Sequence, residues 1–182
     1  YTNAGIIDAT AKNDLETVGN AQISTTQSKF GGSSMYFDGN GDWLQFPNNP
    51  LYALGSSDFT IEAWIYLGTT SVGQTICAKE TNGVYDTFLF YVNSSNKLTL
   101  SLSSTGSVYA LDISGTTSLT SGTWYHVAAV RNGSAANNVK LYLNGTQEVQ
   151  GSFSGSVYND TSSLTVGYRQ SASTLYLSLI HI

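Results

Sequence analysis

The stretch from Phe30 to Pro47, FGGSSMYFDGNGDWLQFP, has an unusual centre, DGNGD. Asp38, Asn40 and Asp42 stand at every second position, with a glycine between each pair. An EF-hand calcium loop begins with the same spacing of oxygen-bearing side chains. The first question for this sequence is therefore whether the stretch binds a metal or only turns the chain.

Two positions exclude the EF-hand interpretation. With Asp38 as position 1, position 6 is Trp43, where the sharp turn of an EF-hand needs glycine. Position 12 is Asn49, where the bidentate glutamate would stand. Apolar and polar residues alternate on both sides of the centre, which predicts a β-hairpin with Asn40-Gly41 near its tip.

The same period-two alternation dominates the rest of the chain. In DFTIEAWIYL (58–67) the aliphatic positions Ile61, Ala63 and Ile65 alternate with polar or aromatic ones. Sustained helical periodicity is absent, and the 18 glycines often stand in turn dipeptides such as Asn144-Gly145. These patterns predict an all-β, antiparallel sandwich or barrel. Further predicted strands cover 86–92, 97–103, 108–113, 124–130, 139–143 and 163–167.

Aromatic residues stand opposite the aliphatic ones on several predicted strands. Trp64 and Tyr66 share one face of the 58–67 strand. Such rings could form a partly exposed, concave aromatic face, on which sugars stack while Asn, Asp and Gly supply hydrogen bonds. The alternative, that the rings complete a second layer of the core, stays open.

The composition restricts the partners. Of the 182 residues only 10% are charged, against a usual value of roughly 25%, and the net charge is -5. No basic patch is present, so we expect no nucleic acid and no anionic membrane as partner. The apolar runs are too short to span a bilayer, so we expect no membrane insertion. Sparse charge suits a protein that works outside a cell or on a particle surface.

Residues suited to catalysis are scarce. His126 lies within a predicted strand and has no nucleophile at useful spacing, so a hydrolytic triad is not expected. The paired carboxylates of a glycoside hydrolase are also missing, since Asp58 belongs to a turn and leaves Glu62 alone on its strand. Cys77, the single cysteine, is expected to be a small buried apolar residue.

Five motifs, taken together, resemble a known family. FGGSSMYFDGNGDWLQFP, SDFTIEAWIYL, SGTWYHVAAVRNG, VKLYLNGTQEVQGSFSG and SLTVGY occur in the order and at the spacing of LamG-like domains. These domains belong to the concanavalin A-like lectin/glucanase superfamily, and the resemblance covers roughly residues 30–168. It implies a jelly roll of two antiparallel sheets, here a single domain over residues 1–176.

The resemblance also implies a function and sites. We expect a non-catalytic carbohydrate-binding, lectin or adhesion module, within a longer secreted, cell-surface or virion protein, that binds a glycan or a surface polysaccharide. Laminin-type relatives imply a calcium site, with Asp86, Asn159 and Asp160 as its surface ligands and Asp38 at a separate structural cation. The sugar-binding residues stay open, and the candidates are Tyr85, Tyr91 and Trp64.

The last residues depart from the family pattern. Relatives end on a strand with an acidic residue and an arginine, whereas this chain reads STLYLSLIHI. We expect residues 177–182 to be a non-native tail, which would leave one sheet edge unpaired. Two alternatives to glycan binding stay open: a structural or assembly module of a phage tail or capsid protein, and a glycoside hydrolase.

Overall fold

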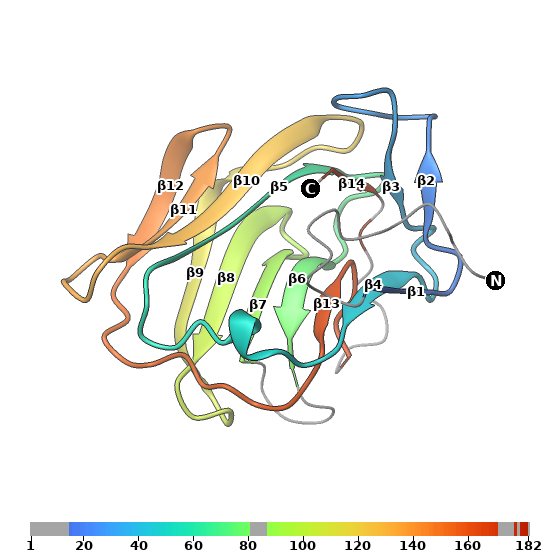
Figure 1. Cartoon of the computed structure of the whole chain (residues 1–182). Coiled ribbons are helices and arrows are strands. Elements are labelled where there is room, and N and C mark those ends of the chain that lie inside the picture. Colours follow the sequence, from blue (N-terminus) through green and yellow to red (C-terminus); the bar gives the residue numbers. More distant parts are fainter. Residues whose placement is uncertain (1–14, 81–86, 171–176, 178, 182) are drawn as a thin grey trace.

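Two antiparallel β-sheets pack face to face in a computed structural model of the chain (Figure 1), which describes residues 15–80, 87–170, 177 and 179–181. In spatial order, sheet A contains β1 (Glu16–Val18), β4 (Trp43–Phe46), β13 (Leu164–Val166), β6 (Gln74–Lys79), β7 (Phe88–Val92), β8 (Lys97–Ser103) and β9 (Tyr109–Ser118). Sheet B contains β12 (Thr146–Gly151), β11 (Val139–Leu143), β10 (Trp124–Arg131), β5 (Phe59–Tyr66), β14 (Leu179–His181), β3 (Ser34–Tyr36) and β2 (Gln22–Ser24). The predicted antiparallel sandwich is confirmed.

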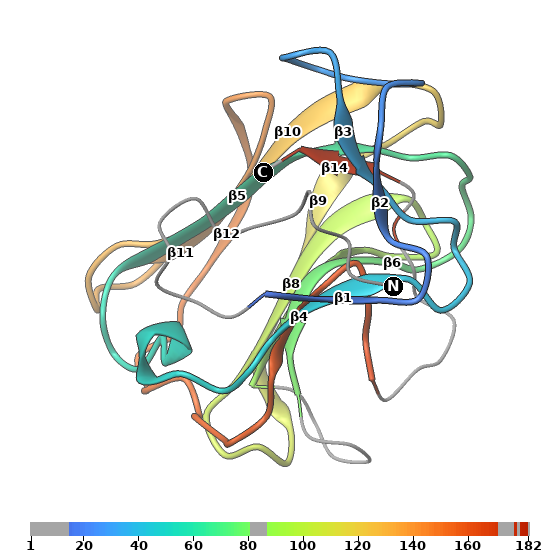
Figure 2. The ribbon, with the colours of Figure 1, turned by 45° about the vertical axis from the view of Figure 1, so that its right-hand side comes forward.

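The core lies between the two sheets, which form separate layers in Figure 2. Leu98, Leu100 and Leu102 of β8 are at most 1% exposed and belong to the same apolar cluster as Ala63 and Ile65 of the other layer. The alternation read from the sequence thus places these side chains on the inner faces. A single 3₁₀ turn, η1 (Pro50–Tyr52), breaks the strand pattern. Within the described residues, no helix is long and apolar enough to span a membrane.

The DGNGD centre carries the chain from one sheet to the other. β3 before it pairs with β2 and β14 in sheet B, and β4 after it pairs with β1 and β13 in sheet A. The predicted hairpin is therefore wrong, because the flanking strands pair with other strands instead of with each other. Gly39 and Gly41 have φ angles of 84° and 82°, which glycine adopts without strain, and they allow the sharp change of direction.

β14 fills a position inside sheet B. Leu179 is in register with Tyr36 of β3 on one side and with Tyr66 of β5 on the other. The expected unpaired edge is therefore wrong, because the backbone of residues 179–181 occupies it. That residues 177–182 are non-native stays a prediction.

Glu148 of β12 connects the edge strands of the two sheets on one side of the sandwich. Its carboxylate accepts hydrogen bonds from the backbone N–H groups of Thr116 and Thr117 at 2.8 Å. It also accepts hydrogen bonds from the hydroxyls of both threonines at 2.9 Å. Since Thr116 and Thr117 belong to β9, this carboxylate joins the edge strands of sheets A and B.

Candidate functional site

Aromatic side chains lie together on the outer face of sheet B. Trp64 of β5 is in register with His126 of β10, and Tyr66 is in register with Trp124. The ring centroids are 5.3 Å apart in the first pair and 5.5 Å apart in the second. All four side chains are half-buried. Of the two alternatives left open for Trp64 and Tyr66, the structure therefore favours the partly exposed aromatic face.

Tyr36 extends this face toward the β2 edge of the sheet. It is in register with Leu179, which is in turn in register with Tyr66. Residues in register on adjacent antiparallel strands project from the same side of a sheet. Tyr36 and Tyr66 therefore lie on one face, separated by β14.

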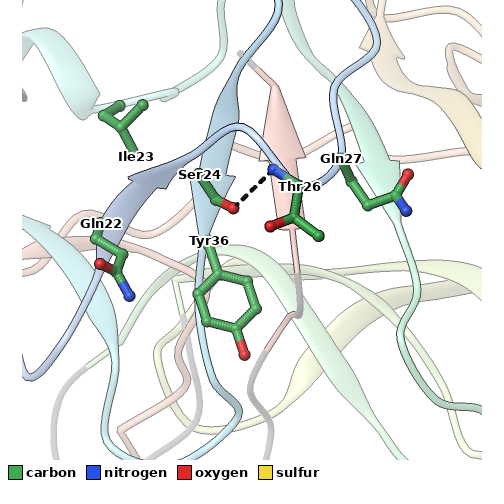
Figure 3. Close-up of a pocket in the computed structure, with 6 residues that line it drawn as sticks. All are labelled: Gln22, Ile23, Ser24, Thr26, Gln27 and Tyr36. Atoms are coloured by element: carbon green, nitrogen blue, oxygen red, sulfur yellow. Dashed lines mark hydrogen bonds between the residues drawn. The ribbon is translucent and has the colours of Figure 1, made fainter.

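A pocket of about 330 Å³ opens beside Tyr36 (Figure 3). The phenol ring of Tyr36 forms one side of it, and Gln22 lies next to that ring, as expected from their shared register. None of the lining side chains is charged. The pocket is lined by Gln22, Ile23, Ser24, Thr26, Gln27 and Tyr36.

Local hydrogen bonds fix the wall of this pocket. The hydroxyl of Ser24 accepts a hydrogen bond from the N–H of Thr26 at 3.2 Å, which turns the chain at the end of β2. The hydroxyl of Ser34 donates to the carbonyl of Gln27 at 2.7 Å and holds the connection against β3. The amide side chains of Gln22 and Gln27 are exposed and able both to donate and to accept hydrogen bonds.

The same connection, residues 25–33, reaches over sheet B as far as β5. The ammonium of Lys29 lies 4.3 Å from the ring centroid of Trp64 and 5.8 Å from that of Phe30. The rings of Phe30 and Trp64 meet edge to face at 5.5 Å. The pocket and the Trp64 cluster thus share one segment of chain and one face of the molecule.

The other candidate sugar-binding rings do not join this site. Tyr91 is in register with Thr75 and Thr99, opposite the core-facing leucines of β8, and so projects from the outer face of sheet A. Tyr91 and Trp64 therefore lie on opposite outer faces of the sandwich and cannot contact one small ligand together. Tyr85 lies outside the described residues.

Asp160, predicted as a calcium ligand, already has a cation beside it. The ammonium of Lys79 lies 2.7 Å from Asp160 Oδ1 and donates to the carbonyl of Asp160 at the same distance. The hydroxyl of Ser162 donates to Oδ1 at 2.6 Å. The Lys79 side chain is fully buried and that of Asp160 is 9% exposed. An ammonium at this distance does not fit beside a calcium ion, so these surroundings do not suit calcium.

The remaining predicted cation ligands stay untested. Asp86 lies outside the described residues, and Asn159 is exposed. Asp38 is exposed too, and its Oδ1 accepts a hydrogen bond from the N–H of Asn40 at 2.7 Å in a local turn. No group of three or more His, Cys, Asp or Glu side chains suited to a metal occurs among the residues that the structure describes.

The acids considered for hydrolysis do not meet. Asp58 precedes β5, as predicted, and accepts a hydrogen bond from the N–H of Gly133 at 2.6 Å. Glu62 is 60% exposed on the sheet surface, where its carboxylate lies 3.3 Å from His126 Nε2. Burial raises the pKa of the Cys77 thiol to about 12, so it stays protonated at neutral pH, as expected of a buried apolar residue.

Most of the pocket was not identified from the sequence. Gln22, Ser24 and Thr26 belong to a polar segment with no strong strand pattern, and β2 itself was not predicted. The outward orientation of Tyr36 could have been predicted from the sequence. Tyr36 follows Met35 in SSMYF, so it must face away from the core if Met35 faces inward. Its neighbours could not be found, because their positions depend on the pairing of β2 with β3.

Comparison with known proteins gives one family and several similar folds. The model of a family described as the concanavalin A-like lectin/glucanases superfamily matches residues 38–181. No curated protein matches the chain.

Three solved structures illustrate the similar folds. The binding domain of Paraclostridial Mosquitocidal Protein 1 has a TM-score of 0.69 and 14% identity, and the alignment covers 93% of this chain and 44% of that one. The receptor binding domain of botulinum neurotoxin C/D mosaic serotype has a TM-score of 0.63, 14% identity and coverages of 93% and 41%. Domain 4 of AbnA, a GH43 extracellular arabinanase from Geobacillus stearothermophilus in complex with arabinotriose, has a TM-score of 0.67, 16% identity and coverages of 98% and 84%. The chain thus spans less than half of the two toxin domains.

Proposed function

This chain belongs to the concanavalin A-like lectin/glucanases superfamily, and we propose that it is a non-catalytic carbohydrate-binding module whose binding site is the pocket beside Tyr36. The observation that carries the proposal is the lining of that pocket. One aromatic ring stands among neutral amides and hydroxyls, on an aromatic face of the sheet.

This lining suits a sugar for two reasons. A pyranose or furanose ring presents C–H groups on its faces, and these pack against the electron-rich face of an aromatic ring such as Tyr36. Its hydroxyls each donate and accept hydrogen bonds, which the side chains of Gln22, Gln27 and Ser24 are able to match. A pocket of about 330 Å³ lies at the lower end of the range for small-molecule sites.

The structural neighbours support the same class of function. They include the binding domains of two toxins and an arabinanase domain in complex with arabinotriose. For this chain we propose a role outside the cell, as one part of a larger protein. The absence of a close carboxylate pair at Asp58 and Glu62 supports a binding role instead of hydrolysis.

A glycan array followed by calorimetry tests the proposal. We expect the wild-type chain to bind a defined set of glycans, and arabinotriose is the first soluble probe for calorimetry. Tyr36→Ala should weaken binding of the array hits at least about tenfold, because stacking and pocket shape are both lost. Tyr36→Phe keeps the ring and should retain most of the affinity.

The matched control is Tyr91→Ala, which removes a ring from the opposite outer face. Equal unfolding midpoints in urea would show that Tyr36→Ala still folds. If Tyr91→Ala abolished binding and Tyr36→Ala did not, the site would lie on sheet A instead. If no glycan bound and the chain self-associated, the assembly role would replace the proposal.

Calcium assistance is a separate and untested part of the proposal. Since Asp160 is paired with Lys79, a calcium site would now depend on Asp86 and Asn159. Repeating the array with EDTA separates the two parts, because the pocket lining contains no carboxylate and should bind without calcium.

A further inference from the structure

Lys29 and Phe30 lie beside the neutral pocket, on the same face of the molecule. Lys29 adds a positive charge to this face, and Phe30 adds an exposed aromatic ring. Phe30 is 52% exposed, although its edge contacts Trp64. Lys29 is exposed as well, with its ammonium over the Trp64 ring at 4.3 Å. Both residues follow shortly after Thr26 and Gln27, which line the pocket, with only Ser28 between Gln27 and Lys29.

The neighbouring charges leave Lys29 available to an anion. Among the described residues, the ion pairs are Lys79–Asp160, Arg169–Glu80 and His126–Glu62, and Lys29 takes part in none of them. Glu62 is the acid on β5 closest in sequence to Trp64, and its carboxylate is directed at His126. The ammonium of Lys29 therefore contacts rings instead of a carboxylate.

We propose that Lys29 and Phe30, with Trp64 beneath them, form a second subsite that binds a sugar unit carrying a carboxylate. This inference rests on the proposed function, because the subsite adjoins the pocket beside Tyr36. The C–H face of the sugar packs on the exposed ring of Phe30, and the carboxylate pairs with the ammonium of Lys29.

The charge at this subsite decides between classes of ligand. A quaternary ammonium ligand would find aromatic rings here but would be repelled by Lys29. A neutral sugar would gain from the rings and from hydrogen bonds that the ammonium donates to its hydroxyls, but it forms no ion pair. A carboxylated sugar adds an ion pair to these contacts, because its charge complements the ammonium of Lys29. The overall charge of -5 would repel anions in general, so this preference must come from the local ammonium.

The experiment compares matched pairs of glycans on an array. Each pair differs only in a carboxylate: glucuronate against glucose, galacturonate against galactose, and sialylated against desialylated chains. We expect the wild-type chain to bind the carboxylated member about three- to tenfold more tightly in low salt. The preference should shrink at about 0.5 M NaCl, because salt screens exposed charges.

Two variants and a matched control assign the preference to Lys29. Lys29→Gln should abolish the difference in affinity between the carboxylated and the neutral member of each pair, and Lys29→Arg should retain that difference. Lys140→Gln removes another lysine from the outer face of the same sheet, on β11, and should leave the preference intact. Since Lys29 is exposed, the unfolding midpoint of Lys29→Gln in urea should match that of the wild type.

Each outcome decides the inference. Binding to neutral glycans with no gain from a carboxylate would overturn it and leave the proposed function standing. Equal losses in Lys29→Gln and Lys140→Gln would also overturn it, because the effect would then be a general one of surface charge. No binding to any glycan would overturn both the inference and the proposed function.

Discussion

Asp42 shows how one buried carboxylate organises a turn. Its side chain is 1% exposed. Oδ2 accepts a hydrogen bond from the N–H of Asp38 at 2.9 Å, and Oδ1 accepts one from the N–H of Asn20. Gly19 lies directly against this turn, where a Cβ atom would meet the carbonyl oxygen of Gly41 at 2.1 Å. Asp42 therefore joins two turns that are far apart in the sequence.

We predict that Asp42→Asn lowers the free energy of unfolding by about 1–3 kcal/mol. The amide keeps one acceptor oxygen but places an N–H donor against a backbone N–H, so one hydrogen bond is lost. Urea unfolding followed by tryptophan fluorescence measures the change. Asp38→Asn is the control and should cost far less, because Asp38 is exposed. Equal losses in the two variants would contradict the role given to Asp42.

The single residues were predicted unevenly, for physical reasons. The spacing of Asp38, Asn40 and Asp42 was recognised, but the hairpin predicted there was wrong, and the burial of Asp42 was not foreseen. Asp160 was predicted as a calcium ligand, and its pairing with Lys79, which stands 81 positions away, was not foreseen. A local sequence pattern cannot show which distant lysine or arginine forms an ion pair with a given carboxylate.

At the scale of elements, the Lys79–Asp160 pair joins β6 to the loop before β13. Both side chains are at least nine-tenths buried, so each charge depends on the other for compensation. We predict that Lys79→Met lowers the free energy of unfolding by about 3–5 kcal/mol, because Asp160 is left buried without its partner. Urea unfolding measures the loss.

The double variant Lys79→Met/Asp160→Asn tests this explanation. An asparagine carries no charge and still accepts the hydrogen bonds of Ser162, so most of the lost stability should return. If the double variant were as unstable as Lys79→Met alone, packing of the Lys79 stem would explain the loss better than the buried charge.

The contact between β12 and β9 should make stability depend on pH. Burial alone would raise the pKa of Glu148, but the hydrogen bonds from Thr117 and Thr116 outweigh it and hold the pKa below its usual range. The folded state thus favours the carboxylate, so the stabilisation is fully present above the unfolded pKa of about 4.3. It is lost as the pH falls through the lower, folded pKa.

We therefore predict that the wild type is more stable than Glu148→Gln at pH 7, and that the difference shrinks as the pH falls below about 4. Urea unfolding of both proteins at half-unit intervals of pH gives this difference directly. A difference that stays constant from pH 7 to pH 3 would show that the ionised carboxylate is not the cause.

Strands with strong alternation were predicted well. The seven strands predicted from alternation correspond to β5, β7, β8, β9, β10, β11 and β13. The turn Asn144-Gly145 links β11 and β12 as a two-residue hairpin, with φ angles of 49° and 80°. The missed strands β1, β2 and β14 have three residues each, and so short a segment carries too little alternation to be recognised. β6 and β12, with six residues each, were missed as well. All six residues of β6 are buried, so its sequence QTICAK lacks the regular apolar–polar alternation of a half-buried strand.

At the scale of the whole molecule, the sheet order could not be predicted from residue patterns alone. Alternation shows which side of a strand is apolar, but not which strand lies next to it. The resemblance to LamG-like domains predicted the two-sheet sandwich. It did not predict that the chain passes from one sheet to the other at DGNGD. For the same reason Trp64 was found as a candidate, whereas its contact with Lys29 and Phe30 was not.

The place of β13 has a consequence for synthesis on the ribosome. β13 lies between β4 and β6 and pairs with both, although both are made long before it. Until residue 166 leaves the exit tunnel, β4 and β6 each present an unpaired edge to the cytosol, the kind of edge that joins chains on neighbouring ribosomes. These edges of the nascent domain therefore stay open to aggregation until β13 has been made, and it is at this stage, more than in the finished fold, that we expect the domain to depend on chaperones.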